Sequence, residues 1–132
     1  MIALDTNILV RVVAADDVRQ TATARALINS QACFVTLTVT LELEWVLRSL
    51  YASPRNKIAH AIGSLLDLPS LHFEREDDVL SALELYRAGF DFADALHHAA
   101  AAGCDAFATF DRDLIKRAKR RSLMPPVELA RS

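Results

Sequence analysis

Two aspartates follow short apolar runs of the kind that form buried strands. Asp5 comes directly after residues 2–4, and Asp111 comes two residues after the run that ends at Thr109. In an open α/β sheet, ligands bind outside the carboxyl ends of the parallel strands. Either aspartate alone is explained equally well as the N-cap of the helix that follows. Because both leave strand ends, we interpret them as parts of one shared site.

Helical spacing separates two neighbouring glutamates. Glu44 has Arg48 four residues later, which is the favourable orientation for an exposed ion pair. Glu42 instead has Trp45 and Val46 three and four residues later, with no cation in local reach. A carboxylate on a helix face shared with a tryptophan is costly unless something pairs with it. We therefore predict a functional role for Glu42 and a surface role for Glu44.

Asp94 is a third aspartate, and its position has two interpretations. It lies in the first turn of an expected helix, three residues after Asp91. The two residues therefore suit a capping arrangement, with Asp91 as the N-cap and Asp94 favoured by the helix dipole. The same position also projects Asp94 toward a sheet edge, so it belongs to the site if the other acids gather there.

Four carboxylates in one crevice would constrain the chemistry of the site. Their mutual repulsion either raises their pKa values or requires a cation among them. Oxygen ligands without a nearby Cys or His select hard cations, so Mg²⁺ or Mn²⁺ is the expected occupant. Such a metal lowers the pKa of a bound water and neutralises charge on a phosphate oxygen. The residues therefore predict metal-assisted hydrolysis of a phosphodiester by Asp5, Glu42, Asp94 and Asp111.

Other chemical motifs are weaker or missing. His97 and His98 are about 100° apart on a helix and cannot both face one metal. His98 lies four residues after Asp94 and either orients it or is a partly buried ring without function. The sequence has no GxxxxGK[ST], GxGxxG, GxSxG or HExxH motif, which excludes phosphate-loop hydrolases, dinucleotide enzymes, serine hydrolases and zincins.

Short apolar runs and helical segments alternate along the chain. We expect strands at residues 2–4, 33–35, 71–73 and 106–109, and helices at 7–14 (capped by Asn7), 18–30, from Thr38 or Thr40 to about 50, 54–69, 75–88, 92–102 and 113–121. This alternation predicts an α/β fold, a three-layer α/β/α sandwich with a short parallel central sheet. The strand order does not follow from the pattern.

Length and composition predict one domain over residues 1–132. The chain is 52% apolar and 24% charged, which excludes intrinsic disorder. No apolar stretch is long enough to cross a bilayer, and the N-terminus has no signal-peptide pattern, so we expect a cytoplasmic protein without membrane contact. Cys33 and Cys104 both lie among apolar residues, and we interpret them as buried thiols.

Charge is distributed unevenly despite a formal net charge of −2. Six cations crowd one short segment near the C-terminus: Arg112, Lys116, Arg117, Lys119, Arg120 and Arg121. A basic helix attracts a phosphate backbone through counterion release. The same pattern also fits a solvated helix face with cations near its C-terminus, and the sequence does not decide between the two.

Four ordered motifs resemble those of PIN-domain ribonucleases. They are LDTNIL at residues 4–9, LEL at 41–43, FADAL at 92–96 and TFDRDL at 109–114. The short length and the basic end resemble the VapC-type toxins of type II toxin–antitoxin systems. The resemblance implies a compact PIN-like α/β/α domain that cleaves RNA, commonly a structured RNA such as a tRNA, with Mg²⁺ or Mn²⁺.

The resemblance also implies roles for particular residues. Asp5, Glu42 and Asp94 match the invariant acids of the family. Asp111 matches the fourth acid, and Asp113 is close enough to contribute. Supporting positions are matched by Thr6, Asn7 and Thr109, and the candidates for contacts to the RNA backbone are Arg112, Lys116 and Arg120.

The implied partners are a second copy of the chain, in a homodimer, and a VapB-type antitoxin that neutralises the toxin. Two readings remain beside this one: a non-catalytic module that binds metal or RNA, and a structure-selective DNA nuclease. A haloacid-dehalogenase phosphatase is disfavoured because its second Asp would stand where Asn7 is. A receiver-type domain is disfavoured because the required acid pair and lysine are missing.

Overall fold

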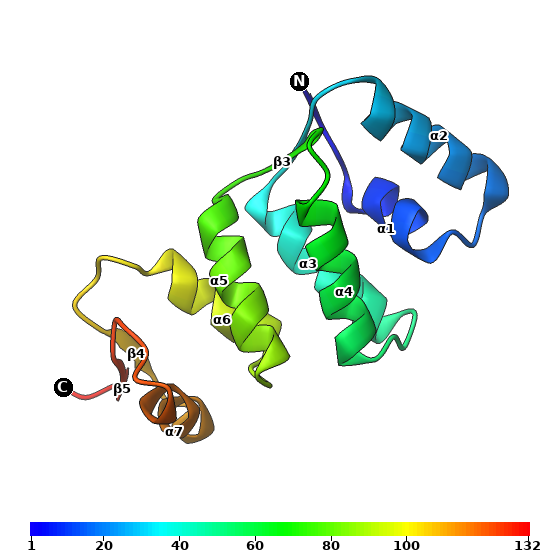
Figure 1. Cartoon of the computed structure of the whole chain (residues 1–132). Coiled ribbons are helices and arrows are strands. Elements are labelled where there is room, and N and C mark those ends of the chain that lie inside the picture. The colour runs from blue at the N-terminus through cyan, green and yellow to red at the C-terminus, as the bar shows by residue number, and fades with distance from the viewer.

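The computed structural model describes all 132 residues as seven helices and five short strands (Figure 1). In chain order they are β1 (Ile2–Ala3), α1 (Thr6–Ala14), α2 (Val18–Ser30), β2 (Cys33–Val35), α3 (Leu37–Ser49), α4 (Arg55–Leu66), β3 (Leu71–Phe73), α5 (Glu76–Arg87), α6 (Phe92–Ala100), β4 (Phe107–Thr109), α7 (Arg112–Arg120) and β5 (Val127–Leu129). The predicted α/β class with short parallel strands is confirmed. None of the helices is long and apolar enough to span a bilayer.

All strand pairs are parallel, but the strands form two sheets where we expected one. β2 lies between β1 and β3, with Cys33 opposite both Ile2 and Leu71. β4 pairs only with β5, with Phe107 opposite Val127. β1 is therefore an edge strand, and Ile2 and Ala3 are exposed although their apolar character predicted burial. The second edge of β1 and one edge of β4 have no partner strand.

One hydrophobic core of 24 buried residues joins β2, β3 and Leu4, which follows β1, to the helices α1 to α6. Its largest fully buried side chains include Tyr86 on α5 and Phe92 on α6, whose rings meet edge to face at 5.3 Å. This contact fixes α6 against α5 beside the start of α6. Only Leu114 represents α7 in the core cluster, so the C-terminal elements lie largely outside it.

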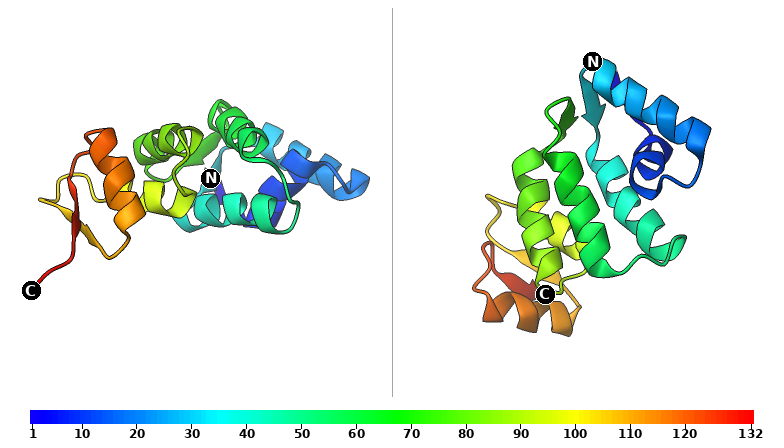
Figure 2. Two further views of the ribbon diagram at one scale, coloured as in Figure 1. Left: turned by 90° about the horizontal axis from the view of Figure 1, so that it is seen from below. Right: turned by 45° about the vertical axis from the view of Figure 1, so that its right-hand side comes forward.

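β4, α7 and β5 form a separate C-terminal unit at one end of the molecule (Figure 2). The unit is docked onto the rest of the chain through polar contacts as well as Leu114. His98 Nε2 lies 2.8 Å from the carbonyl oxygen of Pro125. Arg117 donates a 2.7 Å hydrogen bond to the carbonyl oxygen of Gly89.

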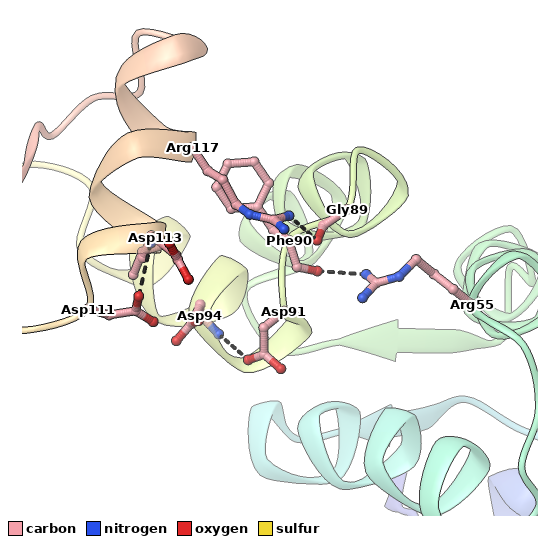
Figure 3. Close-up of a pocket in the computed structure, with 9 residues that line it drawn as sticks. Arg55, Gly89, Phe90, Asp91, Asp94, Asp111, Asp113 and Arg117 are labelled. Atoms are coloured by element: carbon pink, nitrogen blue, oxygen red, sulfur yellow. Dashed lines mark hydrogen bonds between the residues drawn. The ribbon is translucent and has the colours of Figure 1, made fainter.

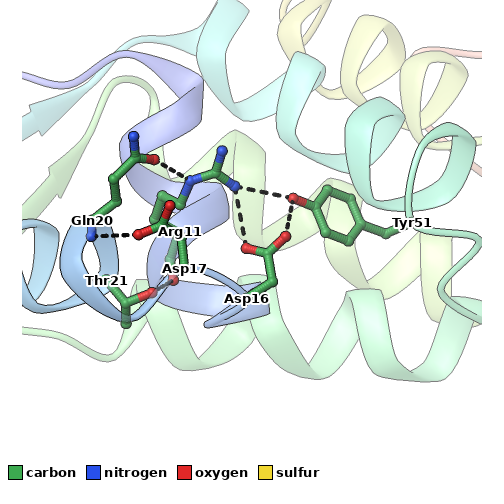
Figure 4. Close-up of polar contacts among 6 residues, drawn as sticks. All are labelled: Arg11, Asp16, Asp17, Gln20, Thr21 and Tyr51. Carbon is green, nitrogen blue, oxygen red and sulfur yellow. Dashed lines mark hydrogen bonds and ion pairs between the residues drawn. The ribbon is translucent and has the colours of Figure 1, made fainter.

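A polar cluster stabilises the opposite end of the molecule (Figure 4). Arg11 of α1 donates to Gln20 of α2 and, through Nη1, to Asp16 and the hydroxyl of Tyr51. Tyr51 in turn donates to Asp16. The cluster connects the α1–α2 turn to the end of α3.

Several predicted boundaries change because other residues cap the helices. Asp5 caps α1 in place of Asn7, and Thr36 caps α3 in place of Thr38 or Thr40. Asp111 caps α7, which begins one residue earlier than predicted. Cys33 is buried as expected, but Cys104 is exposed in the segment after α6, which corrects its predicted burial.

Candidate functional site

An open cleft of about 250 Å³ lies where the N-termini of α6 and α7 meet the start of α4 (Figure 3). Four aspartates and two arginines line it, together with Gly89, Phe90 and Leu114: Asp91, Asp94, Asp111, Asp113, Arg55 and Arg117. Three of the predicted acids are thus brought together from two separate helices. The cleft carries both signs of charge, with carboxylates on α6 and α7 and guanidinium groups on α4 and α7.

Helix capping determines the positions of the two central acids. Asp91 caps α6 by accepting a 3.1 Å hydrogen bond from the amide of Asp94, which places Asp94 in the first turn as predicted. Asp111 caps α7 by accepting a 3.0 Å bond from the amide of Leu114. The Thr109 hydroxyl accepts a 3.0 Å bond from the Asp111 amide and so fixes the turn that leaves β4. Thr109 therefore supports the acid that follows its strand.

The electrostatics of the cleft favour a bound cation. Burial raises the pKa of Asp94, and the negative charges of Asp91 and Asp111 raise it further, while His97 acts in the opposite direction. Repulsion among carboxylates is relieved either by protonation or by a positive ion. The cleft therefore provides a favourable environment for a metal ion next to Asp94.

Two arginines stabilise the loop between α5 and α6. Arg55 Nη1 donates to the carbonyl oxygens of Tyr86 at 2.9 Å and Phe90 at 2.7 Å, and its guanidinium lies 4.3 Å from the centre of the Tyr86 ring. Arg117 Nη1 donates to Gly89 from the other side of the loop. A guanidinium has five N–H donors, and the Nε and Nη2 groups of both arginines have no acceptor within the protein. These groups remain free to bind a phosphate in the cleft.

The other two predicted acids lie in a second group at the end of β1. Asp5 caps α1, and its carboxylate accepts a 2.7 Å bond from the Thr6 amide. The buried Thr6 hydroxyl donates a 2.5 Å bond to Glu42 on α3. Asn7 is exposed beside them. Neither Asp5 nor Glu42 lines the cleft. Asp5 follows β1 and Asp111 follows β4, and these strands belong to different sheets.

The carboxylate donors of the cleft suit a hard divalent cation. No three His, Cys, Asp or Glu side chains converge closely enough to form a complete protein cage for a metal. Mg²⁺ does not require such a cage, since it is usually held by one or two carboxylates together with waters and substrate phosphates. Asp94 and Asp111, which face each other across the ends of two helices, supply that minimal set.

The family of the chain follows from a comparison with known protein families. The PIN domain matches residues 2–120, which is nearly the whole chain. This protein belongs to the PIN domain family. No curated protein matches the chain. PIN domains are in general metal-dependent nucleases that bind nucleic acids, so the acidic cleft lies in a domain of the nuclease kind.

Glu44 has a different position in this PIN domain from the one we predicted. Its side chain is buried, with 3% exposed, instead of lying on the surface. It accepts a 2.9 Å bond from Arg48 Nε and a 3.1 Å bond from the Tyr86 hydroxyl. Burial, followed by the charge of Glu44, raises the pKa of Tyr86 to about 12. Glu42 is the exposed glutamate, and Trp45 beside it is half exposed, so the argument from a buried shared face was wrong.

Two further predictions about side chains are resolved by the contacts. His98 is buried and bonds to Pro125, and its ring meets Phe107 edge to face, so it holds the C-terminal unit and does not orient Asp94. Of the three predicted RNA-contacting cations, Arg112 and Lys116 line a second groove between α7 and β5. Arg120 lines neither that groove nor the acidic cleft.

Three charged residues of the cleft were not found by the sequence analysis. Asp91 was interpreted as a cap only, although it both caps α6 and lines the cleft. Arg117 lies four residues after Asp113, so helical spacing was a usable signal that the two share a face. Arg55 had no comparable signal, because its position in the cleft depends on how α4 packs against α5.

Proposed function

We propose that this PIN domain is an endoribonuclease that hydrolyses RNA phosphodiesters with Mg²⁺ or Mn²⁺, and that it acts as a VapC-type toxin. The observation that carries the proposal is the acidic cleft, where burial and the neighbouring charges of Asp91 and Asp111 raise the pKa of Asp94. A site of this kind favours a cation, and the two free guanidinium edges beside it favour an anionic substrate. Metal-assisted cleavage of a polyanion accounts for both preferences.

Asp94 and Asp111 would hold the metal, with Asp113 and Asp91 close enough to bind its waters. When bound, the metal activates a water and neutralises charge on a phosphate oxygen. Arg55 and Arg117, which line the same cleft as the carboxylates, orient the phosphate through their free N–H groups. Thr109 holds Asp111 in place through the bond to its amide.

Asp5 and Glu42 complete the proposed catalytic set, supported by Thr6 and Asn7. The support for this assignment is local: Thr6 links the two carboxylates of the second group at the carboxyl end of β1, since its amide donates to Asp5 and its hydroxyl donates to Glu42. Ligands bind at that end of parallel strands. The motif order at residues 4–9 and 41–43 agrees with the assignment.

The biological context that we propose follows from the resemblance to VapC-type toxins. The substrate would be a structured RNA such as a tRNA, and the protein would act in the cytoplasm as a homodimer. A VapB-type antitoxin would neutralise it. Trp45 and Leu50 on and beside α3 are 50% and 69% exposed, which leaves apolar surface for a partner.

The decisive test is cleavage of total small RNA by the purified chain with Mg²⁺ or Mn²⁺, compared with EDTA and with Asp94→Asn. We expect discrete cuts that depend on the metal and are lost in the variant. Asp105→Asn is the matched control, because it removes the same charge from an exposed loop residue outside the cleft. Binding without cutting under any metal would instead favour a non-catalytic module. Cutting of branched DNA alone would favour a structure-selective DNA nuclease.

A further inference from the structure

A groove of about 830 Å³ runs between α7 and β5 on the C-terminal unit. Four cations line it, and Glu128 is its only acid: Arg112, Lys116, Lys119 and Arg131. None of the four forms a salt bridge within the chain. The groove is therefore a concentrated positive surface on a protein whose net charge is −2.

The helical cations of the groove form a single row. Arg112, Lys116 and Lys119 are spaced by four and three residues, so they share one face of α7. At a rise of about 1.5 Å per residue, they lie roughly 6 Å and 4.5 Å apart along the helix axis. A row of exposed cations with this spacing matches an extended chain of phosphates better than a single anion.

The floor of the groove is apolar. Ile115, Leu123, Val127 and Leu129 are half-buried side chains that line it between α7 and β5. A paired duplex hides its bases and offers mainly its sugars and phosphates to a protein, whereas an unpaired strand exposes base faces. Proteins that bind single strands combine a positively charged groove for the backbone with aromatic side chains on which the bases stack. This groove has the positive charge, and aliphatic side chains take the place of the aromatic ones as an apolar surface for the bases.

The groove adjoins the acidic cleft around the N-terminus of α7. Arg112 lines the groove and follows directly after Asp111, which lines the cleft. The face of α7 that carries Asp113 and Arg117 is turned to the cleft, and the face with Lys116 is turned to the groove. A strand in the groove therefore has a short path to the carboxylates.

We propose that the α7–β5 groove binds an unpaired segment of RNA next to the phosphate that is cut, with its backbone on the cationic rim and its bases on the apolar floor. The proposal rests on the proposed ribonuclease function for its biological meaning. The binding itself is testable without cleavage.

The first test measures binding of a fluorescent single-stranded 12-nucleotide RNA by anisotropy, in EDTA so that no metal is present. We compare Lys116→Gln/Lys119→Gln with Arg19→Gln/Arg25→Gln. Both double variants remove two positive charges, but Arg19 and Arg25 are exposed on α2, at the opposite end of the molecule (Figure 1). The groove variant is expected to bind roughly tenfold more weakly. For this variant, the slope of log K against log salt concentration should also be less steep by about 1.4, which is the value for two lost phosphate contacts to a single strand.

Two results of this comparison would overturn the proposal. Equal weakening in both double variants would mean that only net charge matters. Unchanged binding in the groove variant would mean that the strand binds elsewhere. Circular dichroism and thermal unfolding of both variants confirm that neither result comes from misfolding.

The second test varies the ligand and leaves the protein unchanged. An abasic strand of equal length and charge should bind several-fold more weakly, and a blunt duplex of the same sequence should also bind more weakly. Equal binding of either ligand would overturn the role of the apolar floor. Displacement of the RNA by polyglutamate at equal charge concentration would identify the groove as a site for acidic peptides and would also overturn the proposal.

The outcomes separate this proposal from the ribonuclease proposal. Groove-dependent binding without cleavage supports the groove and contradicts the ribonuclease. Cleavage with an unchanged KM in Lys116→Gln/Lys119→Gln supports the ribonuclease and contradicts the groove. If both proposals hold, the groove variant raises KM and leaves kcat within about twofold.

Discussion

The body of the protein and its C-terminal unit are built on different principles. The body, residues 1–105, contains 23 of the 24 residues of the core cluster, all except Leu114. The unit at residues 106–132 holds seven of the fifteen Lys and Arg residues but only three of the seventeen acids. Stability is therefore concentrated in the body. The unit contributes charge, two of the cleft acids and the groove.

The largest expected effect tests whether the two regions form one site. Asp94→Asn is expected to lower the RNA cleavage rate at least about a hundredfold, the usual lower range for loss of a positioned catalytic group. The same measurement on Asp5→Asn and Glu42→Gln then sharpens the comparison. Equal losses would show that both acid groups act together, and full activity in these two variants would confine the chemistry to the acidic cleft.

Removal of a buried polar group should lower the free energy of unfolding more in the body than in the unit. Glu44→Ala leaves the buried Tyr86 hydroxyl without its acceptor, which costs about 1–3 kcal/mol of the free energy of unfolding. Glu44→Gln retains an acceptor and should cost less. Urea unfolding measures both values. If Glu44→Ala lowers the free energy of unfolding no more than the exposed Glu84→Ala does, the buried contact is contradicted.

Arg117 tests how firmly the unit is attached to the body. Arg117→Gln removes the bond to Gly89, so amide hydrogen exchange in β4 and β5 should quicken several-fold while exchange in α3 and α5 stays unchanged. Arg121→Gln, on an exposed residue at the end of α7, serves as the control. Faster exchange throughout the chain would show that body and unit unfold as one.

The smallest effect concerns pH and requires metal-free protein. Because the folded-state pKa of Asp94 is raised, the folded state binds more protons than the unfolded state between the ordinary value of 3.8 and the raised one. The contribution of Asp94 to the free energy of unfolding is therefore fully present below that window, and it is lost as pH rises through the window. Asp94→Asn should show a smaller fall between pH 3.5 and 6 in thermal unfolding. An identical pH profile for both proteins would contradict the raised pKa.

Local signals in the sequence predicted much of the fold because each depends on neighbouring residues. The bounds of α2, β2 and β3 agree with the prediction, since turn residues and apolar periodicity mark their ends. β5 was not predicted as a strand, because residues 127–129 become one only by pairing with β4. The exposure of β1 was missed for the same kind of reason, since strand order does not follow from a local pattern.

The candidate site was predictable only in part. Asp94 and Asp111 were found from helix starts and strand ends, and the structure brings them together. Arg55 enters the cleft through the packing of α4 on α5, which no spacing in the sequence reveals. Glu44 looked like an exposed partner of Arg48, and its burial depends on Tyr86, which is 42 residues away in sequence.

The attachment of the C-terminal unit has a consequence for engineering. A single backbone connection, between α6 and β4, joins residues 106–132 to a body that retains nearly all of the core. The unit can therefore be exchanged with that of another PIN domain, or rebuilt along α7, with little redesign of the remaining chain. The contacts of His98, Leu114 and Arg117 are the ones to preserve in such a chimaera.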